Sequence, residues 1–435
     1  MLRFLIWMEQ FMSRKTDVII IGSGLAGLMA AYSAAKKGAR TRLISEGMGN
    51  LSISPGCIDI LGYDSQGKQL ADPWSGIQSL DSDHPYTLLG QDVIRESVDY
   101  LVSLLAARGL DMAGSKNDDN IQANTPVPTI MGTLKPSWLV QDSPQALEQL
   151  KKAKRILVLS VAGFRDCRPS LIASQLARYS DWSDRSFDTQ ILPMPFTDLR
   201  RSINALDLAH YLDRAEGRDW FFNRIKGLGK NHDLVLLPPM LGQKPDSRVR
   251  KTLQAELGSP FMELLSVPPG VSGLRIRHAL IDTLVDMGVE IYENAQVREA
   301  TTQGNKAVSI RLHSSGRDME HKADAFVIAT GGIIGGGIIL GEGKASEAIF
   351  GTSLSVPANV DDWSEKEVFG AHLISRLGMK VNNRLQVAGL DNVYYAGRTL
   401  GGYDYAREKS GHGVACATGW QAGRLAAEQA QGVNK

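Results

Sequence analysis

The hydrophobic pattern near the start of the chain predicts a strand, a turn and a helix in quick succession. Val18–Ile21 is a β-branched apolar run, typical of a strand buried on both faces. Gly22-Ser-Gly-Leu-Ala-Gly27 follows as G-x-G-x-x-G, and Leu28–Ala35 then has the composition of a helix. Thr41–Ser45 can form a second strand, which ends at Glu46. The pattern therefore predicts a βαβ unit.

The same region offers a second interpretation, because Val18 to Ala35 is a run of eighteen residues without a charge. Roughly 20 apolar residues can cross a bilayer. The internal order favours a dinucleotide site instead, since its first glycine permits a tight turn and its third lets the helix pack on the strand. The middle glycine lets a diphosphate approach the backbone at the helix N-terminus. We therefore assign Gly22, Gly24 and Gly27 to a nucleotide or flavin site, with Glu46 accepting hydrogen bonds from ribose hydroxyls.

A second alternation of strands and helices follows in the middle of the chain. It predicts strands at 156–164, 189–195 and 233–241, with helices at 168–179 and 203–215. Such an alternation is typical of parallel strands. Before it, residues 111–128 are polar and rich in Pro and Asn, which predicts an exposed loop, and 129–139 predicts a strand or hairpin.

The last third of the chain returns to the first pattern. A helix is predicted at 273–287, and a strand runs into Ala329-Thr-Gly-Gly332, the second fingerprint of two-dinucleotide-binding flavoproteins. A short strand ends at Gly397, and Ser410 opens a final helix. We predict an α/β fold, a Rossmann-like flavin-binding domain of the two-dinucleotide-binding type with an inserted α/β domain. The expected divisions are 12–80 (first segment of the flavin domain), 81–153 (connecting or cap segment), 154–270 (inserted domain) and 271–435 (second segment of the flavin domain).

Composition narrows the functional classes. The 435 residues include 48 basic and 47 acidic side chains, a net charge of +1, and no basic tract, so we expect no nucleic-acid partner. The three cysteines are far apart and make no zinc or iron–sulfur motif, so no metal is expected, and the chain suits a reducing cytoplasm. The first residues, MLRFLIWMEQFM, have two interpretations: an upstream start with Met12 as the true first residue, or an amphipathic patch.

Small and hydroxylated residues near the predicted strand ends are the candidate flavin contacts. Serine hydroxyls after the second strand can bond ribityl or phosphate oxygens. A glycine-rich helix start can supply positive potential beside an anionic reduced flavin ring. The candidates are Ser52, Ser54, Gly56, Thr330, Gly331, Gly397, Gly411 and Gly413. An ordinary turn and a plain helix start would explain the same residues.

At this point the chain resembles a known family, the B subunits of anaerobic glycerol-3-phosphate dehydrogenase, over nearly its whole length from about Asp17. Beyond the glycine turn, the resemblance rests on four stretches. They are Leu51-Ser-Ile-Ser-Pro-Gly-Cys-Ile-Asp-Ile-Leu61, His84-Pro-Tyr-Thr-Leu-Leu-Gly90, Gly132-Thr-Leu-Lys-Pro-Ser-Trp-Leu139 and Leu400-Gly-Gly-Tyr-Asp404. The second and third stretches are far more particular than the glycine turn.

The resemblance implies a flavin-dependent complex that oxidises sn-glycerol 3-phosphate to dihydroxyacetone phosphate and passes electrons to the quinone pool. It implies two partner chains, namely the catalytic A subunit, which holds FAD, and the iron–sulfur C subunit. The latter would hold the complex on the inner, cytoplasmic face of the cell membrane. The resemblance implies FMN for the present chain, whereas G-x-G-x-x-G with Glu46 favours FAD. Both flavins stay open at this point.

The candidate catalytic residues are His412, Arg398 and His84. Arginine suits a substrate phosphate, and histidine can take a hydroxyl proton. His84 could instead cap a turn, and the cluster from Arg275 to His278 is expected on the solvated face of a helix. Three functions remain open: substrate oxidation in this chain, a non-catalytic flavin relay or structural role, or an oxidoreductase acting on another substrate. Without a cysteine cluster, electrons must leave through a partner or a diffusible acceptor.

Overall fold

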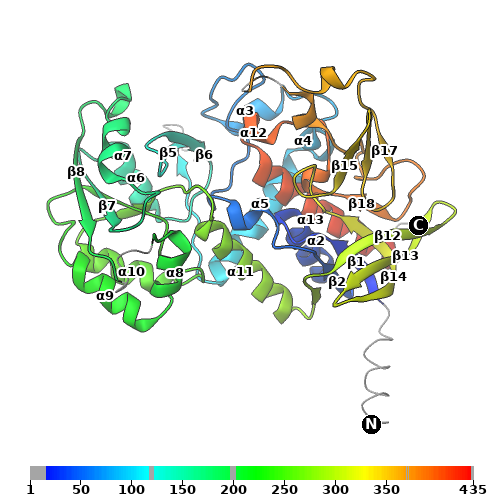
Figure 1. Cartoon of the computed structure of the whole chain (residues 1–435), viewed down its shortest axis with the longest axis horizontal. Helices are drawn as coiled ribbons and strands as arrows, with labels where there is room; N and C mark the ends of the chain where they lie inside the picture. The colour runs from blue at the N-terminus through cyan, green and yellow to red at the C-terminus, as the bar shows by residue number, and fades with distance from the viewer. Residues whose placement is uncertain (1–15, 117–121, 196–201, 369, 371, 433–435) are drawn as a thin grey trace, which may run out of the picture.

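The structure is a computed structural model that describes residues 16–116, 122–195, 202–368, 370 and 372–432. Both interpretations of the first twelve residues therefore lie outside the described residues. Within them the chain forms a large sheet with its helices, and a second, smaller sheet beside it, drawn mainly in green in Figure 1.

The large sheet has a parallel region that brings together distant segments of the chain. Its order is β11-β2-β1-β14-β18, with β1 (Thr16–Ile21), β2 (Thr41–Ile44), β11 (Glu290–Tyr292), β14 (Arg317–Ile328) and β18 (Val393–Tyr395). Ile21, Ile328 and Tyr395 are in register at one edge. The segments that follow these three strands therefore meet at their carboxyl ends, where ligands bind in such sheets.

The same β14 also belongs to an antiparallel meander. Its first half pairs with β13 (Lys306–Ser314), which pairs in turn with β12 (Gln296–Gln303). The β13–β14 turn is Ser315-Gly316, and both residues have positive φ, 52° and 75°. Such a two-residue turn matches the right-handed twist of paired strands.

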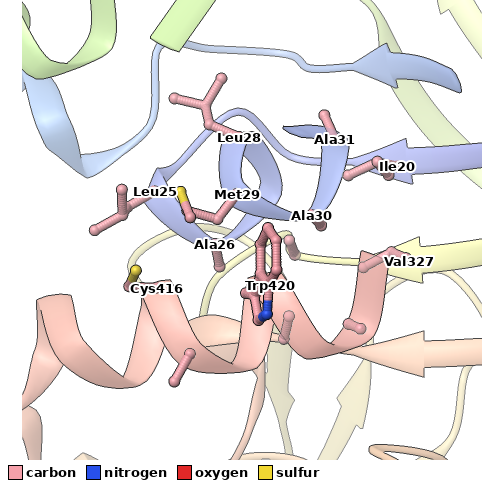
Figure 2. Packing of buried hydrophobic residues seen from close by; sticks show 14 of the residues in the cluster. Ile20, Leu25, Ala26, Leu28, Met29, Ala30, Ala31, Val327, Cys416 and Trp420 are labelled. Atoms are coloured by element: carbon pink, nitrogen blue, oxygen red, sulfur yellow. The ribbon is translucent and has the colours of Figure 1, made fainter. Parts of the chain in front are cut away.

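Two helices beside the large sheet pack closely because glycines face the contact. A Cβ added at Gly419 of α13 (Gly411–Ala430) would lie 2.2 Å from the Ala26 oxygen of α2 (Leu25–Lys36). One added at Gly423 would lie 2.1 Å from the Ala30 oxygen, so the two helices run in the same direction. Figure 2 shows Trp420 and Cys416 of α13 beneath this face of α2.

The eighteen-residue uncharged run forms β1 and most of α2, and both are buried in this core. The helix α5 (Gln91–Ala107) packs on α13, and α11 (Val271–Asp286) packs on α2 and α5. The described residues include no helix that is long and apolar enough to cross a membrane. Short helices α3 (Pro73–Ile77), α4 (Pro85–Leu89) and α12 (Tyr405–Glu408) and the small sheet of β15 (Ile338–Gly341), β16 (Lys344–Glu347) and β17 (Ser353–Leu354) complete this region.

The second sheet is parallel, with the order β10-β9-β7-β8 and a hydrophobic core of its own. Its strands are β7 (Arg155–Val161), β8 (Ser186–Leu192), β9 (Leu234–Leu237) and β10 (Phe261–Glu263). The first three coincide with the predicted strands. Its helices are α6 (Pro144–Lys152), α7 (Pro169–Leu176), α8 (Ala205–Leu212), α9 (Ala215–Ile225) and α10 (Ser247–Leu257), of which α7 and α8 match the predicted ones.

The predicted exposed loop over 111–128 is wrong for its last residues. There β5 (Thr125–Pro128) pairs with β6 (Leu134–Ser137) as a hairpin, as predicted for the stretch that follows. Val127 is 1% exposed. The two prolines of β5 made a strand seem unfavourable, because proline cannot donate to a sheet, yet a strand with only one partner tolerates it.

Candidate functional site

The glycine turn after β1 has two kinds of glycine. A Cβ at Gly22, where φ is +112°, would lie 2.2 Å from the Ala329 oxygen, and one at Gly27 would lie 1.8 Å from the Gly22 oxygen. Protein packing therefore requires both. A Cβ at Gly24 would meet no atom within 4 Å, so the protein itself leaves this side open. Gly24 precedes α2, which has no side-chain cap. Open space before an uncapped helix N-terminus fits a diphosphate.

The ends of β14 and β18 lie against this turn. The Gly397 nitrogen donates to Thr418 Oγ1 at 2.8 Å, and a Cβ at Gly397 would lie 2.6 Å from Ala26 Cβ. The Gly331 nitrogen donates to Thr399 Oγ1 at 3.2 Å. Thr330 Oγ1 is buried and has no hydrogen-bond partner among the described residues. The three predicted residues thus come together, and the supporting threonines are ones that sequence reasoning missed.

The loop after β2 also folds back onto the turn. Glu46 follows the strand and is exposed, as a ribose contact would be. Ser23 Oγ donates to the Gly47 oxygen at 2.8 Å. Gly49, with φ of +68°, lies so close that a Cβ there would be 2.7 Å from Gly24 Cα. This close approach was not predicted, although a second glycine soon after the strand was a signal for it.

The predicted serines lead to the start of α13. Ser54 Oγ lies 2.9 Å from His412 Nε2 and accepts the Gly56 amide at 3.0 Å. Burial lowers the pKa of His412, as does the charge of Lys135, although Asp59 opposes the shift. The imidazole is therefore neutral near pH 7 and can accept a proton. Ser52 Oγ donates to the Gly49 oxygen at 2.9 Å instead.

The first turn of α13 extends past α2. Gly411 precedes Gly419, which faces Ala26, by eight residues, or roughly 12 Å along the helix axis. Ser410 provides no side-chain cap, and Gly411 and His412 are partly exposed. A Cβ at Gly413 would lie 2.0 Å from Tyr86 Oη, so this glycine serves packing.

Both ring nitrogens of His84 have partners within the protein. Nδ1 accepts the Tyr86 amide at 3.0 Å as the N-cap of α4, and Nε2 lies 3.2 Å from Glu408 Oε2. The side chain is 2% exposed. This arrangement matches the capping alternative, and the catalytic role of His84 stays a prediction.

Arg398 is also engaged by the protein. Its guanidinium donates to the carbonyl oxygens of Leu377 (2.9 Å), Leu400 (3.3 Å) and Ser375. It lies over the rings of Tyr403 and Tyr405, at 5.6 and 5.4 Å from their centroids. These contacts leave the predicted role in substrate or flavin binding as a prediction.

Comparison with known proteins agrees with this geometry. A family model described as FAD binding domain matches residues 17–414. The B subunit of a probable anaerobic glycerol-3-phosphate dehydrogenase from Halobacterium salinarum is 31% identical over 435 residues, covering 96% of this chain and 99% of the relative. The chain belongs to the family of anaerobic glycerol-3-phosphate dehydrogenase B subunits.

Other members of the family are similar over the same extent. The B subunit from Vibrio vulnificus is 29% identical, covering 92% of this chain and 94% of its own, and that from Aliivibrio fischeri is 26% identical, covering 95% and 96%. Among solved structures, the quinol fumarate reductase FrdA of E. coli has a TM-score of 0.42 and 10% identity, covering 97% of this chain and 71% of its own. The FAD binding domain makes this dehydrogenase chain a flavoprotein and indicates FAD in particular.

Two of the family stretches meet at the start of α13, a convergence that sequence reasoning missed. Lys135 Nζ, from the Gly132–Leu139 stretch, contacts the Asp59 carboxylate and lies 3.3 Å from Cys57 Sγ. The Asp59 oxygen accepts the Gly413 amide at 3.0 Å. Burial raises the pKa of Cys57 to about 11, so its thiol is neutral. For Lys135, burial alone would lower the pKa, but Asp59 holds it above the ordinary range.

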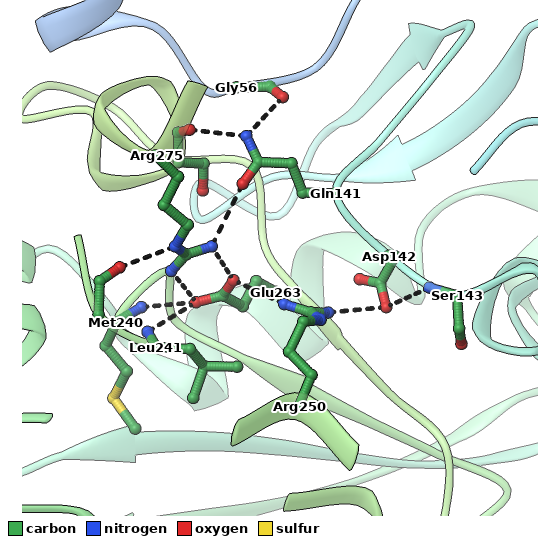
Figure 3. Close-up of polar contacts among 11 residues, drawn as sticks. Gly56, Gln141, Asp142, Ser143, Met240, Leu241, Arg250, Glu263 and Arg275 are labelled. Atoms are coloured by element: carbon green, nitrogen blue, oxygen red, sulfur yellow. Dashed lines mark hydrogen bonds and ion pairs between the residues drawn. The ribbon is translucent and has the colours of Figure 1, made fainter. Parts of the chain in front are cut away.

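The expected solvated face from Arg275 to His278 is wrong for both arginines. Arg275 and Arg277 are 3% and 6% exposed. Arg275 forks both oxygens of Glu263, at 2.5 and 2.9 Å, and the same carboxylate accepts Arg250 at 3.1 Å. Figure 3 shows this network, which joins α11 of the flavin fold to β10 and α10 of the second sheet.

The network also reaches the loop after β2 that carries Gly56. Arg250 donates to Asp142 Oδ1 at 2.9 Å, and Gln141 Nε2 donates to the Gly56 oxygen at 3.0 Å and the Ser272 oxygen at 2.6 Å (Figure 3). Arg275 Nη1 lies 3.4 Å from Gln141 Oε1. The second sheet thus fixes the turn that carries Ser54 and Gly56.

Proposed function

We propose that this chain belongs to a complex that oxidises sn-glycerol 3-phosphate to dihydroxyacetone phosphate with FAD. The observation that carries the proposal is the presence of both the open Gly24 turn and His412 in a chain that matches a B subunit over 96% of its residues. The turn accounts for a dinucleotide. His412 accounts for an acceptor of the hydroxyl proton.

Each portion of FAD has residues that fit it. The N-terminus of α2 at Gly24 would hold the diphosphate, and Glu46 would hold the ribose. Ser52 and Ser54 would meet the ribityl chain. The start of α13 would lie beside the ring, where its helix dipole favours negative charge. Bound flavin supplies an acceptor for the hydride from the substrate carbon.

The protein's own contribution to the reaction is centred on His412. Because burial lowers the pKa of the imidazole, His412 is neutral and accepts the proton that the substrate hydroxyl loses. Ser54 fixes the ring through Nε2, which orients Nδ1. Ser54 in turn is held by the Gly56 amide, so the positioning of the base is built into one short loop.

We further propose two partner chains, namely the catalytic A subunit with FAD, and the iron–sulfur C subunit. The latter would hold the complex on the inner face of the cell membrane and pass electrons to the quinone pool. The family name, with its subunit letter, supports a complex of several chains. The buried, separate cysteines of this chain support an exit of electrons through a partner.

A second candidate function is a flavin relay whose substrate chemistry takes place in the A subunit. It is favoured by the hydrogen bonds that His84 and Arg398 already make within the protein. Of the predicted catalytic side chains, only His412 keeps a ring nitrogen without a hydrogen bond to the described residues. Relay and dehydrogenase differ in whether the substrate reduces this flavin directly.

The deciding experiment mixes the purified chain with glycerol 3-phosphate in the absence of oxygen. Rapid loss of the yellow flavin absorbance, with dihydroxyacetone phosphate formed in equal amount, is expected for the dehydrogenase. Acid extraction of the same sample should release FAD. A flavin that stays oxidised in the lone chain, but is reduced once the A subunit is present, would establish the relay instead.

A further inference from the structure

Lys409 has a backbone conformation that lysine rarely adopts. Its φ is +54° and its ψ +49°, in the left-handed region that glycine and asparagine favour. It directly precedes Ser410, the N-cap of α13. A Cβ at the facing Gly62 would lie 2.9 Å from Lys409 Cβ. A side chain at position 62 would therefore clash with Lys409, and the glycine leaves room for it. Backbone strain of this kind is often found at functional sites. The conformation of Lys409 is therefore a reason to ask what this residue does.

The ammonium group of Lys409 lacks an internal partner. Its side chain is partly buried, and no hydrogen bond or ion pair holds Nζ within the described part of the chain. Burial and the nearby charge of Lys135 lower the pKa of Lys409, and Asp59 and Asp404 oppose the shift. Asp404 already caps α12 through the amides of Ala406 and Arg407. A half-buried cation beside a like charge is unfavourable unless an anion joins them.

Lys135 and Asp59 complete the same corner. Lys135 Nζ contacts Asp59 Oδ2 and lies 3.3 Å from Ser137 Oγ. Asp59 is 6% exposed, and its Oδ1 is buried with no hydrogen-bond partner among the described residues. The Asp59 backbone oxygen accepts a hydrogen bond from the Gly413 amide. The cluster therefore lies at the N-terminus of α13, the positive end of the helix dipole. This corner therefore contains two ammonium groups, those of Lys135 and Lys409, and one carboxylate oxygen, Asp59 Oδ1, that lacks a hydrogen-bond donor.

We propose that Lys409 and Lys135 bind the phosphate group of a small hydroxylated phosphate ester. The proposal rests on the proposed function and extends it, because it assigns the region of the chain that recognises the substrate's phosphate. A phosphate monoester carries nearly two negative charges, which matches two ammonium groups. The hydroxyls of the same ligand supply the donor that Asp59 Oδ1 lacks. Lys135 already pairs directly with Asp59, so a bound phosphate would give Lys409 the direct partner that it lacks.

The test is made on the flavin-loaded chain, together with whatever partner chains copurify with it. In this sample Lys409 is substituted. Lys409→Asn keeps a residue that tolerates the left-handed region and removes the charge. We expect the KM for glycerol 3-phosphate to rise by about 10-fold or more, with kcat within about 2-fold, because a charged hydrogen bond is lost. The inhibition constant of inorganic phosphate should rise by the same factor. Lys409→Arg should recover most of both constants.

The matched control is Arg407→Asn, which removes an exposed positive charge two residues away. It should leave both constants unchanged. A second variant, Lys409→Gly, relieves the backbone strain, so its melting temperature should rise while phosphate binding weakens, which a purely structural role would not produce. Failure of both Lys409→Asn and Lys409→Gly to retain flavin would count against the proposal.

Two outcomes separate this inference from the proposed function. Wild-type protein that binds inorganic phosphate but does not oxidise glycerol 3-phosphate, with binding lost in Lys409→Asn, would support the anion site and overturn the proposed function. Wild-type protein that oxidises glycerol 3-phosphate, with KM and phosphate inhibition unchanged in Lys409→Asn, would overturn the anion site alone. Equal weakening in Arg407→Asn would also overturn it, because general attraction would then suffice.

Discussion

At the scale of single residues, Gly24 is a position where a side chain should affect ligand binding without affecting folding. Its φ is −69°, and a Cβ there would touch no protein atom within 4 Å. Gly24→Val should therefore fold normally and lose its flavin, because the branched side chain fills the space that the diphosphate needs. Absorbance of the purified variant and its circular dichroism measure the two properties. Full flavin content in the folded variant would remove this turn as the phosphate site.

Gly27→Val is the matched comparison, because its Cβ would lie 1.8 Å from the Gly22 oxygen. The same amino acid, three positions further on, should prevent folding rather than only flavin binding. Similar behaviour of the two variants would mean that the glycines do not differ in the way their surroundings indicate.

His412 gives the residue scale a pH dependence. Burial lowers its pKa, so the imidazole stays unprotonated, and competent as a base, to a lower pH than an ordinary histidine. The acid limb of kcat/KM should therefore have its midpoint below about 6.5. His412→Gln should abolish that limb and reduce kcat by about 10²-fold or more. An unchanged pH profile in the variant would assign the proton to another group.

At the scale of elements, the Glu263 network is the mechanical link between β10, α10 and α11. Burial alone would raise the pKa of Glu263, but Arg275 and Arg250 lower it to about 2. A lowered pKa in the folded state gives stability above the unfolded value of 4.5, which is lost as the pH falls from about 4.5 toward 2. At Asp142 the effect of burial outweighs that of Arg250, and the pKa is raised to about 6.

Two substitutions in this network should differ in their effect. Glu263→Gln leaves Arg275 buried without its charge partner and should cost about 3–5 kcal/mol of unfolding free energy. Asp142→Asn removes a carboxylate whose ionisation the fold disfavours, so its cost at pH 7 should be smaller. Urea unfolding of both variants gives the comparison. Equal losses would show that the two carboxylates carry equal weight.

Elements were predictable where their signal was local. The βαβ unit could be predicted because a β-branched run, three glycines and a helix lie within about 30 residues. The strand β5 was missed because Pro126 and Pro128 argue against a strand when the single partner β6 is unknown. Local patterns describe an element, whereas pairing and burial depend on what arrives from elsewhere in the chain.

The candidate site divides in the same way. Its glycines and Ser54 could be chosen from motifs, but Lys135 and Asp59 meet across 76 residues of sequence, and the spacing gives no hint of that contact. Arg275 seemed solvated because a helix with scattered charges usually is. Its burial follows from Glu263, which β10 places opposite, and β10 itself was not predicted.

At the scale of the whole molecule, the described residues hold three separate, buried cysteines and no group that could hold a metal ion. The lone chain should pass electrons from glycerol 3-phosphate to a quinone slowly or not at all, and its partner chains should restore the rate. Stopped-flow measurement of quinone reduction, with and without the partners, makes the comparison. Rapid reduction by the lone chain would show that it is a complete dehydrogenase.

The parallel contact of α2 with α13 also has a consequence for biosynthesis. Gly22 and Gly413 are 391 positions apart, so a ribosome makes one wall of the site long before the other. Until α13 leaves the exit tunnel, the face of α2 around Ala26 and Ala30 lacks the helix that packs on it in the finished fold. We therefore expect cofactor loading to be a late event in the life of the nascent chain, and the exposed α2 to be a surface for chaperones to protect until then.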